Sequence, residues 1–191
     1  MIEHHPQEKI YLTYKTRMTT EARLRKSAQT SHLLLSWYSA CLIVLSIINI
    51  SGRFLVLYPD LISVAVSLVI FALSLFTYGE RYNERADQFK NCYLKLKSLY
   101  EQELVIEQKM LRYSEVLEQY ENQSDKDYDE MLFDSYLRNQ KLKNACGPVR
   151  ITPVIFCRIL ARRFFKKSLV LTFFVAPVAT AVIWVKPLVG G

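Results

Sequence analysis

The sequence predicts an all-α membrane protein with a two-helix transmembrane hairpin, a long cytoplasmic helical hairpin and a third hydrophobic segment near the C-terminus. Three stretches, residues 33–50, 61–78 and 169–185, contain no Lys, Arg, Asp or Glu. A helix rises about 1.5 Å per residue, so about 18 to 20 residues cover the roughly 30 Å hydrocarbon core of a bilayer. Clustered cations beside these stretches and apolar residues at heptad spacing between them complete the prediction.

Residues 1–32 predict an amphipathic cytoplasmic segment that runs directly into the first span. They carry six basic and three acidic residues. A pattern at helical spacing indicates a short amphipathic helix over residues 9–31. It consists of Ile10, Tyr14, Arg17, Met18, Glu21, Leu24 and Ala28. Because its basic residues precede a hydrophobic span, we expect this helix to lie near the lipid headgroups.

Residues 33–78 form the predicted transmembrane hairpin. The connection between its two spans holds only Arg53 and Asp60 as charged residues, whereas basic residues gather before the first and third spans. The positive-inside rule therefore places the N-terminus and residues 79–149 in the cytoplasm and the short connection outside.

Small hydroxyl residues mark one face of the second span. Ser63, Ser67, Ser74 and Thr77 fall within about 80° of one another on a helical wheel. One interpretation is close packing of this face against the first span through Ser39 and Ser46. The other is that several copies of the chain turn the face toward a shared, water-filled path.

Residues 79–149 predict a long polar helix followed by a second helix. The first helix carries an apolar seam at heptad spacing that slips once near its middle. A seam of this size requires a partner, because several hundred Å² of apolar surface would otherwise face water. Ser124 and Asp127 form a capping box for the second helix, which Gly147 and Pro148 end, so the partner can lie in the same chain. Self-association of seams between protomers is the alternative. The seam consists of Tyr82, Phe89, Tyr93, Leu96, Ile106, Tyr113 and Leu117.

Residues 150–167 predict a basic interfacial helix with Pro153 in its first turn. They contain six basic residues and no acidic one, alternating with apolar residues, which is typical of a helix on an anionic membrane surface. Nucleic-acid binding is the competing interpretation. Residues 168–191 hold the third hydrophobic segment, which is transmembrane or, because it contains Pro177, re-entrant. The basic residues expected at the membrane surface are Arg158, Arg162, Arg163, Lys166 and Lys167.

No catalytic, cofactor-binding or metal-binding motif is evident, and the sequence does not predict an enzyme. The five glycines lack the close spacing of phosphate-binding loops. Asp125, Asp127 and Asp129 resemble the start of a calcium loop, but the sixth position is Glu130 instead of glycine. The four cysteines show no CxxC spacing.

The order of these segments resembles a known family. A basic entry helix and two spans are followed by Tyr78-Gly79-Glu80-Arg81-Tyr82, the first residues of the seam, and a polar break at Tyr120-Glu121-Asn122. Over about residues 10–165 this pattern is similar to the SLATT domains, two-transmembrane effectors of bacterial conflict systems, and most similar to their fifth subfamily.

The resemblance implies an effector of antiphage defence in the bacterial inner membrane. Such an effector is expected to oligomerise and to form a pore or disrupt the membrane when a partner encoded nearby senses infection, which stops growth by abortive infection. A reverse transcriptase, a nucleotidyltransferase or a sensor protein would be such a partner. The alternative is a non-conducting adaptor that tethers a cytosolic enzyme through the helical hairpin. A transporter is disfavoured, because no ionisable residue lies inside a span.

Overall fold

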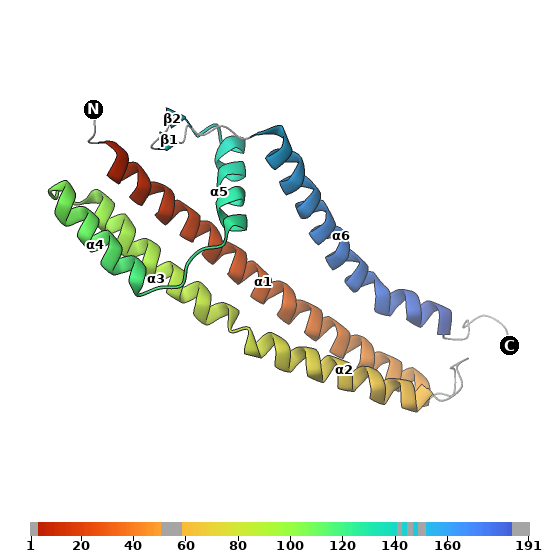
Figure 1. Cartoon of the computed structure of the whole chain (residues 1–191). Helices are drawn as coiled ribbons and strands as arrows, with labels where there is room; N and C mark the ends of the chain where they lie inside the picture. Colours follow the sequence, from red (N-terminus) through yellow and green to blue (C-terminus); the bar gives the residue numbers. More distant parts are fainter. Residues whose placement is uncertain (1–3, 51–58, 141–142, 145–146, 149–151, 185–191) are drawn as a thin grey trace. The chain divides into compact units, whose positions relative to one another are not determined.

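The computed structural model describes residues 4–50, 59–140, 143–144, 147–148 and 152–184. The described chain is almost entirely helical, which confirms the predicted all-α fold (Figure 1). Its elements are α1 (His4–Ile50), α2 (Pro59–Gly79), α3 (Tyr82–Glu101), α4 (Ile106–Glu118), α5 (Asp125–Leu137), β1 (Lys143–Asn144), β2 (Gly147–Pro148) and α6 (Pro153–Trp184). The strands β1 and β2 form a minimal antiparallel pair.

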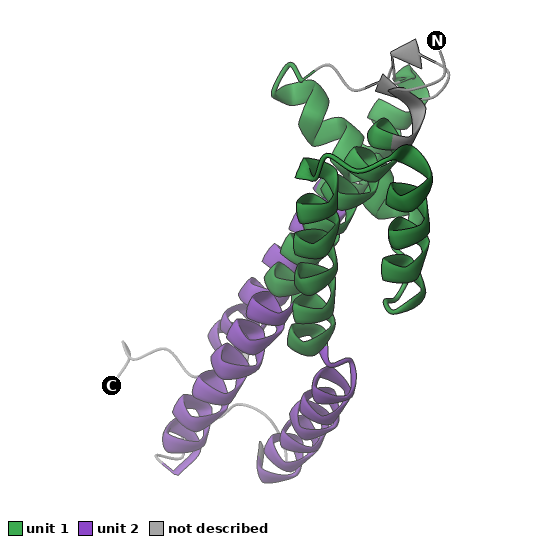
Figure 2. Cartoon of the chain, turned by 90° about the vertical axis from the view of Figure 1, so that its left-hand side faces the viewer, with its two compact units in different colours: residues 1–27, 82–163 green, residues 28–81, 164–191 purple. Residues whose placement is uncertain are grey.

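The chain divides into two compact units (Figure 2). Unit 1 comprises Met1–Ser27 and Tyr82–Arg163, and therefore holds α3, α4, α5 and the first parts of α1 and α6. Unit 2 comprises Ala28–Arg81 and Phe164–Gly191, and holds α2 with the remaining parts of α1 and α6. The longest two helices thus contribute residues to both units.

Three helices carry apolar stretches long enough to cross a membrane. They are α1, α2 and α6, and almost none of the residues in their most apolar windows is buried inside the protein. Side chains such as Ile43, Phe71 and Leu171 are more than 60% exposed. Exposed apolar surface of this extent is stable in lipid and not in water, so the chain is a membrane protein. Most of the predicted external connection, residues 51–58, lies outside the described residues, whereas its last two residues, Pro59 and Asp60, begin α2.

Helix α1 continues from the N-terminal segment into the first span without a break, as predicted. Protein covers the apolar face of its first half, and the headgroup position expected from the sequence stays a prediction. Ile10 packs against α3 and α4, Leu12 against α5, and Leu24 against α3. These three side chains are at most 7% exposed. The amphipathic pattern therefore reflects the core of unit 1.

The predicted long helix over residues 82–120 is instead two helices. Helix α3 ends at Glu101 and α4 begins at Ile106 and packs along it. The slip in the heptad spacing marks this turn. The Lys109 ammonium, 3% exposed, donates to the carbonyl oxygens of Tyr100 and Gln102 at 3.0 and 2.8 Å. It satisfies the Tyr100 carbonyl at the end of α3, which has no intrahelical partner there, and adds a second donor to the Gln102 carbonyl, which also accepts from the Leu104 N–H.

Helix α5 has the predicted start and an earlier end. The Ser124 hydroxyl accepts from the Lys126 backbone N–H, and the Asp127 carboxylate accepts from the Ser124 N–H, which confirms the capping box. The helix ends at Leu137, ten residues before Gly147, and Asn139 adopts a positive φ of 55°. Asparagine tolerates this left-handed conformation better than most residues, so it suits a helix terminus.

Helix α6 begins at Pro153, as predicted, and merges two segments that the sequence separates. The basic stretch and the third hydrophobic segment form one helix to Trp184, with Pro177 inside it. No re-entrant turn occurs in this described range. Proline at the first turn is favourable because its missing N–H has no acceptor there. The residues beyond Trp184, including Val185, lie outside the described residues.

Candidate functional site

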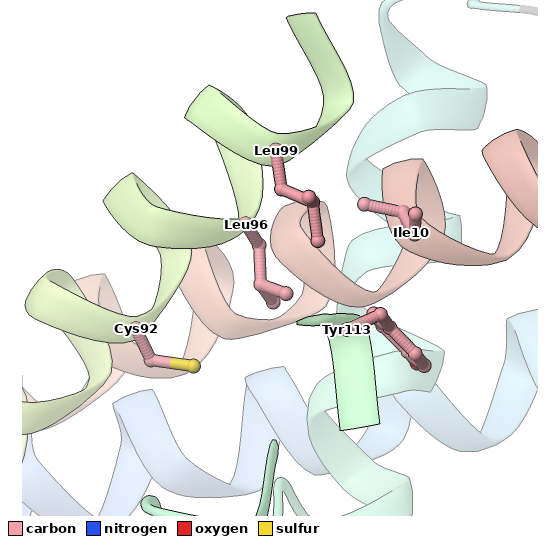
Figure 3. Packing of buried hydrophobic residues seen from close by; sticks show 5 residues of the cluster. All are labelled: Ile10, Cys92, Leu96, Leu99 and Tyr113. Carbon is pink, nitrogen blue, oxygen red and sulfur yellow. The ribbon is translucent and has the colours of Figure 1, made fainter. Parts of the chain in front are cut away.

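Most members of the predicted seam lie in or beside the core of unit 1. Leu96 and Tyr113 are buried together with Ile10, Cys92 and Leu99 (Figure 3). Phe89 is buried in a second cluster, against Leu24 and Ala86. Two further seam residues pack at the edges of these clusters, Leu117 on the first and Tyr82 on the second. The remaining two, Tyr93 and Ile106, are partly exposed.

The partner of the seam therefore lies within the chain, and it differs from the one expected. Ile10 of α1 and Tyr113 of α4 cover α3, whereas Met131 and Leu132 of α5 pack against Leu12 of α1. The intrachain interpretation predicted that α5 would supply the partner. It chose the wrong helix because the first half of α1 was assigned to the membrane surface.

The hydroxyl residues of the spans bond mainly within their own helices. Ser39 donates to the carbonyl oxygen of Leu35 at 2.8 Å, Ser46 to that of Leu42 at 2.9 Å, and Thr77 to that of Leu73 at 2.8 Å. Ser67 donates to the carbonyl oxygen of Val64 at 2.7 Å. Each hydroxyl oxygen keeps acceptor capacity for water or another helix. Ser67 and Ser74 are exposed, whereas Ser63 is half-buried.

Helix α6 is attached to the first span in unit 2 beside its proline. The Tyr38 hydroxyl donates to the carbonyl oxygen of Phe173 at 2.9 Å, and the Trp37 indole N–H donates to that of Phe174 at 3.0 Å. Phe173 is four residues before Pro177, which is buried and lacks an N–H. Sequence reasoning missed this contact, although a proline inside a span always leaves a carbonyl in need of another donor.

Helix α5 joins α1 and α6 within unit 1 through its carboxylates. Asp127 is fully buried, and Arg23 of α1 binds both of its oxygens, with Nε at 2.5 Å from one and Nη2 at 3.1 Å from the other. A bidentate guanidinium is among the strongest partners for a buried carboxylate. The same carboxylate closes the capping box, so one side chain both starts α5 and anchors it to α1.

The next turns of α5 meet the basic part of α6. Arg158 donates to Asp129 at 2.6 Å, and Arg163 donates to Glu130 at 2.5 Å and to Asp134 at 2.6 Å. The Arg163 guanidinium also lies 4.4 Å from the centre of the Phe133 ring. Partial burial acts to lower the pKa of Arg163, but the bonds to both carboxylates outweigh it and raise that pKa. We call these contacts the α5–α6 ion-pair network: Asp129, Glu130, Asp134, Arg158 and Arg163.

The other predicted membrane-surface cations differ in environment. Lys166 and Lys167 are exposed, and no described residue lies within ion-pair distance of either. The Nη1 atom of Arg162 is buried and bonds to no described residue. Two of the five predicted cations thus face carboxylates, and the lysines nearest the apolar part of α6 do not.

A buried guanidinium on α1 was not singled out in the sequence. Arg17 is 1% exposed and donates to the Cys92 sulfur at 2.6 Å and to the Gln123 amide oxygen at 3.2 Å. No described carboxylate lies within ion-pair distance of it. Burial raises the pKa of the Cys92 thiol, and Arg17 opposes this rise. The helical spacing includes Arg17 in the pattern of this helix, but only the structure reveals the partners of its buried guanidinium.

Among the described residues, no group of three His, Cys, Asp or Glu side chains is placed to hold a metal ion. Cys41, Cys92 and Cys157 are free thiols, and Cys146 lies outside the described residues. The features with an evident chemical role are therefore the apolar spans, the α5–α6 ion-pair network and the contact around Pro177.

Comparison with known proteins adds a family. The family model described as "SMODS and SLOG-associating 2TM effector domain family 5" matches residues 3–185. Neither the curated proteins nor the solved structures contain a match to the chain.

Proposed function

Because the chain belongs to family 5 of the SMODS and SLOG-associating 2TM effector domains, we propose that it oligomerises in the bacterial inner membrane and breaches it when a partner protein activates it. The family is one of membrane effectors in conflict systems, and its description implies partner proteins. Pore formation, antiphage defence and abortive infection are our extensions of that membership. The N-terminus is proposed to be cytoplasmic, on the positive-inside rule.

The observation that carries the proposal is the exposed surface of the spans. The apolar parts of α1, α2 and α6 are exposed in the single chain. Lipid can cover most of this surface, but α2 also exposes Ser67 and Ser74 on one face. Polar atoms facing lipid are unfavourable, whereas they are stable at a helix interface or beside water. Association of several α2 helices through this face would provide either environment.

The absence of ionisable residues within the spans bears on selectivity. A path lined by serine and threonine hydroxyls has no fixed charge that would favour cations or anions. We therefore propose a weakly selective conduit that dissipates the membrane potential. Acting on the membrane in this way needs no catalytic site.

Membrane potential in expressing cells tests the proposal. Induction together with the activating partner should depolarise the membrane, and Ser63→Leu/Ser67→Leu should abolish the effect by filling the hydroxyl face. The matched control is Ala65→Leu/Ala72→Leu, which adds the same side chain to exposed positions on the opposite face of α2. Unchanged potential at high expression with the partner present would contradict the proposal.

A non-conducting adaptor is the second candidate. It is favoured by exposed apolar side chains outside the spans, on α3, on α4 and in the turn between them: Leu94, Leu111 and Val105. They could contact a cytosolic enzyme. An adaptor would lose function when these positions become charged and would tolerate Ser63→Leu/Ser67→Leu, the reverse of the result expected for a conduit.

A further inference from the structure

The basic part of α6 lies where the helix enters the apolar region. Arg163 is five residues before Ser168, which begins the apolar part of the same uninterrupted helix. At about 1.5 Å per residue this is roughly 7.5 Å along the axis. Phe164 and Phe165, 75% and 69% exposed, follow Arg163 directly. Exposed aromatic and basic side chains beside a span are typical of the headgroup layer.

Two of the cations in this region are already neutralised by α5. Arg158 faces Asp129, and Arg163 faces Glu130 and Asp134. The acidic side chains of α5 thus occupy the guanidinium groups that a phosphate would bind in the same bidentate manner. We propose that the α5–α6 ion-pair network is a reversible cover over a binding surface for anionic phospholipid headgroups, and that such lipids compete with α5 for Arg158 and Arg163.

Helix α5 is attached to α6 by exposed ion pairs and to α1 by a buried one, and a reversible cover requires the first attachment to be the weaker. The Arg158 side chain is 56% exposed and the Arg163 side chain 33%, and exposed ion pairs contribute little because water screens them. Attraction between a basic residue and an anionic bilayer surface is of similar size, so lipid can offset the loss of the ion pairs. The ring contacts of Phe133 and Tyr136 with Phe156, at 5.2 and 6.3 Å between centroids, also separate when α6 is released and oppose the exchange. By contrast, the carboxylate of Asp127 is fully buried on Arg23, so α5 remains attached to α1 when α6 is released.

Anionic lipid is favoured over other polyanions by position. The exposed Lys166 and Lys167 lie in the sequence between the network and the apolar part of α6, so they add attraction for an anionic ligand at the membrane surface. A nucleic acid would gain nothing from Phe164 and Phe165 in the headgroup layer. The inference requires insertion in a bilayer but no conductance, so it stands or fails separately from the proposed conduit.

The distance between α5 and α6 in nanodiscs provides the test. Spin labels on Arg138→Cys, at the end of α5, and on Cys157, which is exposed on α6, report this distance in the full chain. Cys41→Ala and Cys146→Ser remove competing thiols, while Cys92 is buried and stays unlabelled. In phosphatidylcholine we expect one short distance. Increasing phosphatidylglycerol should convert it to a longer one.

Charge-neutral variants distinguish the network from a general charge effect. Glu130→Gln/Asp134→Asn should shift the transition to a lower phosphatidylglycerol fraction. The matched control is Asp87→Asn/Glu121→Gln, which removes two carboxylates from exposed pairs with Arg25 and Arg85 elsewhere in unit 1, and should not shift it. A distance unaffected by phosphatidylglycerol would overturn the proposal, as would an equal shift in the control. Opening by poly(A) RNA but not by phosphatidylglycerol would overturn the choice of lipid.

Discussion

The Tyr38 hydroxyl donates a 2.9 Å hydrogen bond to the Phe173 carbonyl oxygen, the acceptor that Pro177 leaves without an intrahelical donor. In a regular helix the N–H of residue 177 would bond to this carbonyl. Proline has no N–H, and an unpaired carbonyl is costly away from water. Tyr38 therefore replaces a backbone donor with a side-chain donor, and this replacement attaches α6 to the first span.

The first prediction is that Tyr38 and Pro177 are energetically coupled. Tyr38→Phe should lower the free energy of unfolding by about 0.5 to 1.5 kcal/mol, the range for hydrogen bonds between membrane helices. In a Pro177→Ala background the alanine supplies a backbone N–H that can bond to the Phe173 carbonyl, so Tyr38→Phe should cost much less there. SDS titration in mixed micelles measures all four corners of this double-mutant cycle.

Tyr78→Phe is the control for the cycle. Tyr78 is 84% exposed, and its hydroxyl makes no hydrogen bond to a described residue, so its loss should change stability by less than about 0.5 kcal/mol in either background. Equal costs of Tyr38→Phe with and without Pro177 would show that the bond does not compensate for the proline.

Local signals predicted where helices begin better than they predicted where α5 ends or which helices pack together. The pair Ser124 and Asp127 identified the start of α5, and Pro153 that of α6, because capping and the missing proline N–H act within one turn of helix. The slip before Ile106 indicated an irregularity near the end of α3. It did not predict the turn by which α4 packs back along α3, where Lys109 contacts the carbonyls seven and nine residues earlier in the chain. Heptad spacing contains no information on such a contact.

The second prediction contrasts two arginines of α1. Arg17 is buried with only neutral hydrogen-bond partners, so its charge costs several kcal/mol of desolvation that no described carboxylate offsets. Arg17→Met keeps most of the buried volume and removes the charge. We expect unchanged or increased stability, by up to about 2 kcal/mol, in thermal unfolding of the detergent-solubilised chain.

Arg23→Met is the matched variant for this prediction. It removes the same kind of side chain from the same helix but leaves the buried Asp127 carboxylate without its cation. Stability should fall by about 2 to 3 kcal/mol, because the buried Asp127 carboxylate would keep its charge and lose its cation. Arg17→Met, by contrast, leaves no buried charge without a partner. If Arg17→Met destabilised the chain as much as Arg23→Met, the Arg17 charge would be contributing favourably.

The third prediction concerns the turn between α3 and α4. Lys109→Met should lower stability by about 1 to 3 kcal/mol, because the Tyr100 carbonyl loses the Lys109 donor and the Gln102 carbonyl keeps only the Leu104 N–H. Hydrogen exchange should accelerate at the Gln102 and Leu104 amides, which bond within this turn. Lys97→Met, which removes an exposed and long 3.8 Å ion pair, should have almost no effect on either measurement.

The candidate site was less predictable than the fold. The six cations of residues 150–167 predicted a membrane surface, yet Arg158 and Arg163 meet α5. Charge patterning shows that a basic helix needs anions but not whether lipid or another helix supplies them. Trp37 and Tyr38 carried no signal, because aromatic residues are common in spans and only the position of Pro177 in space gives them a role.

The last prediction uses the raised pKa of Cys92. Burial stabilises the neutral thiol, and Arg17 and Lys95 offset this only in part, so the folded-state pKa lies above the unfolded value. A raised pKa stabilises the folded state fully below the unfolded pKa, and this contribution is lost as pH rises through the folded pKa. Stability of the wild type should therefore fall relative to Cys92→Ala above about pH 8.5, the ordinary thiol pKa.

Maleimide labelling at about pH 9 checks the same prediction at the level of single thiols, since an exposed thiol is then largely ionised. Cys157 is exposed and should react at the rate of a free thiol, whereas Cys92, with no exposed surface, should react at least about 100-fold more slowly until the chain unfolds. Denaturant should equalise the two rates. Tyr14 and Tyr128, whose pKa values are also raised by burial, should add to the alkaline loss of stability only at higher pH, and Tyr128→Phe isolates the contribution of Tyr128. Comparable labelling of Cys92 and Cys157 in the folded chain would mean that the cluster around Ile10 opens readily, and the predicted dependence of stability on pH would then be absent.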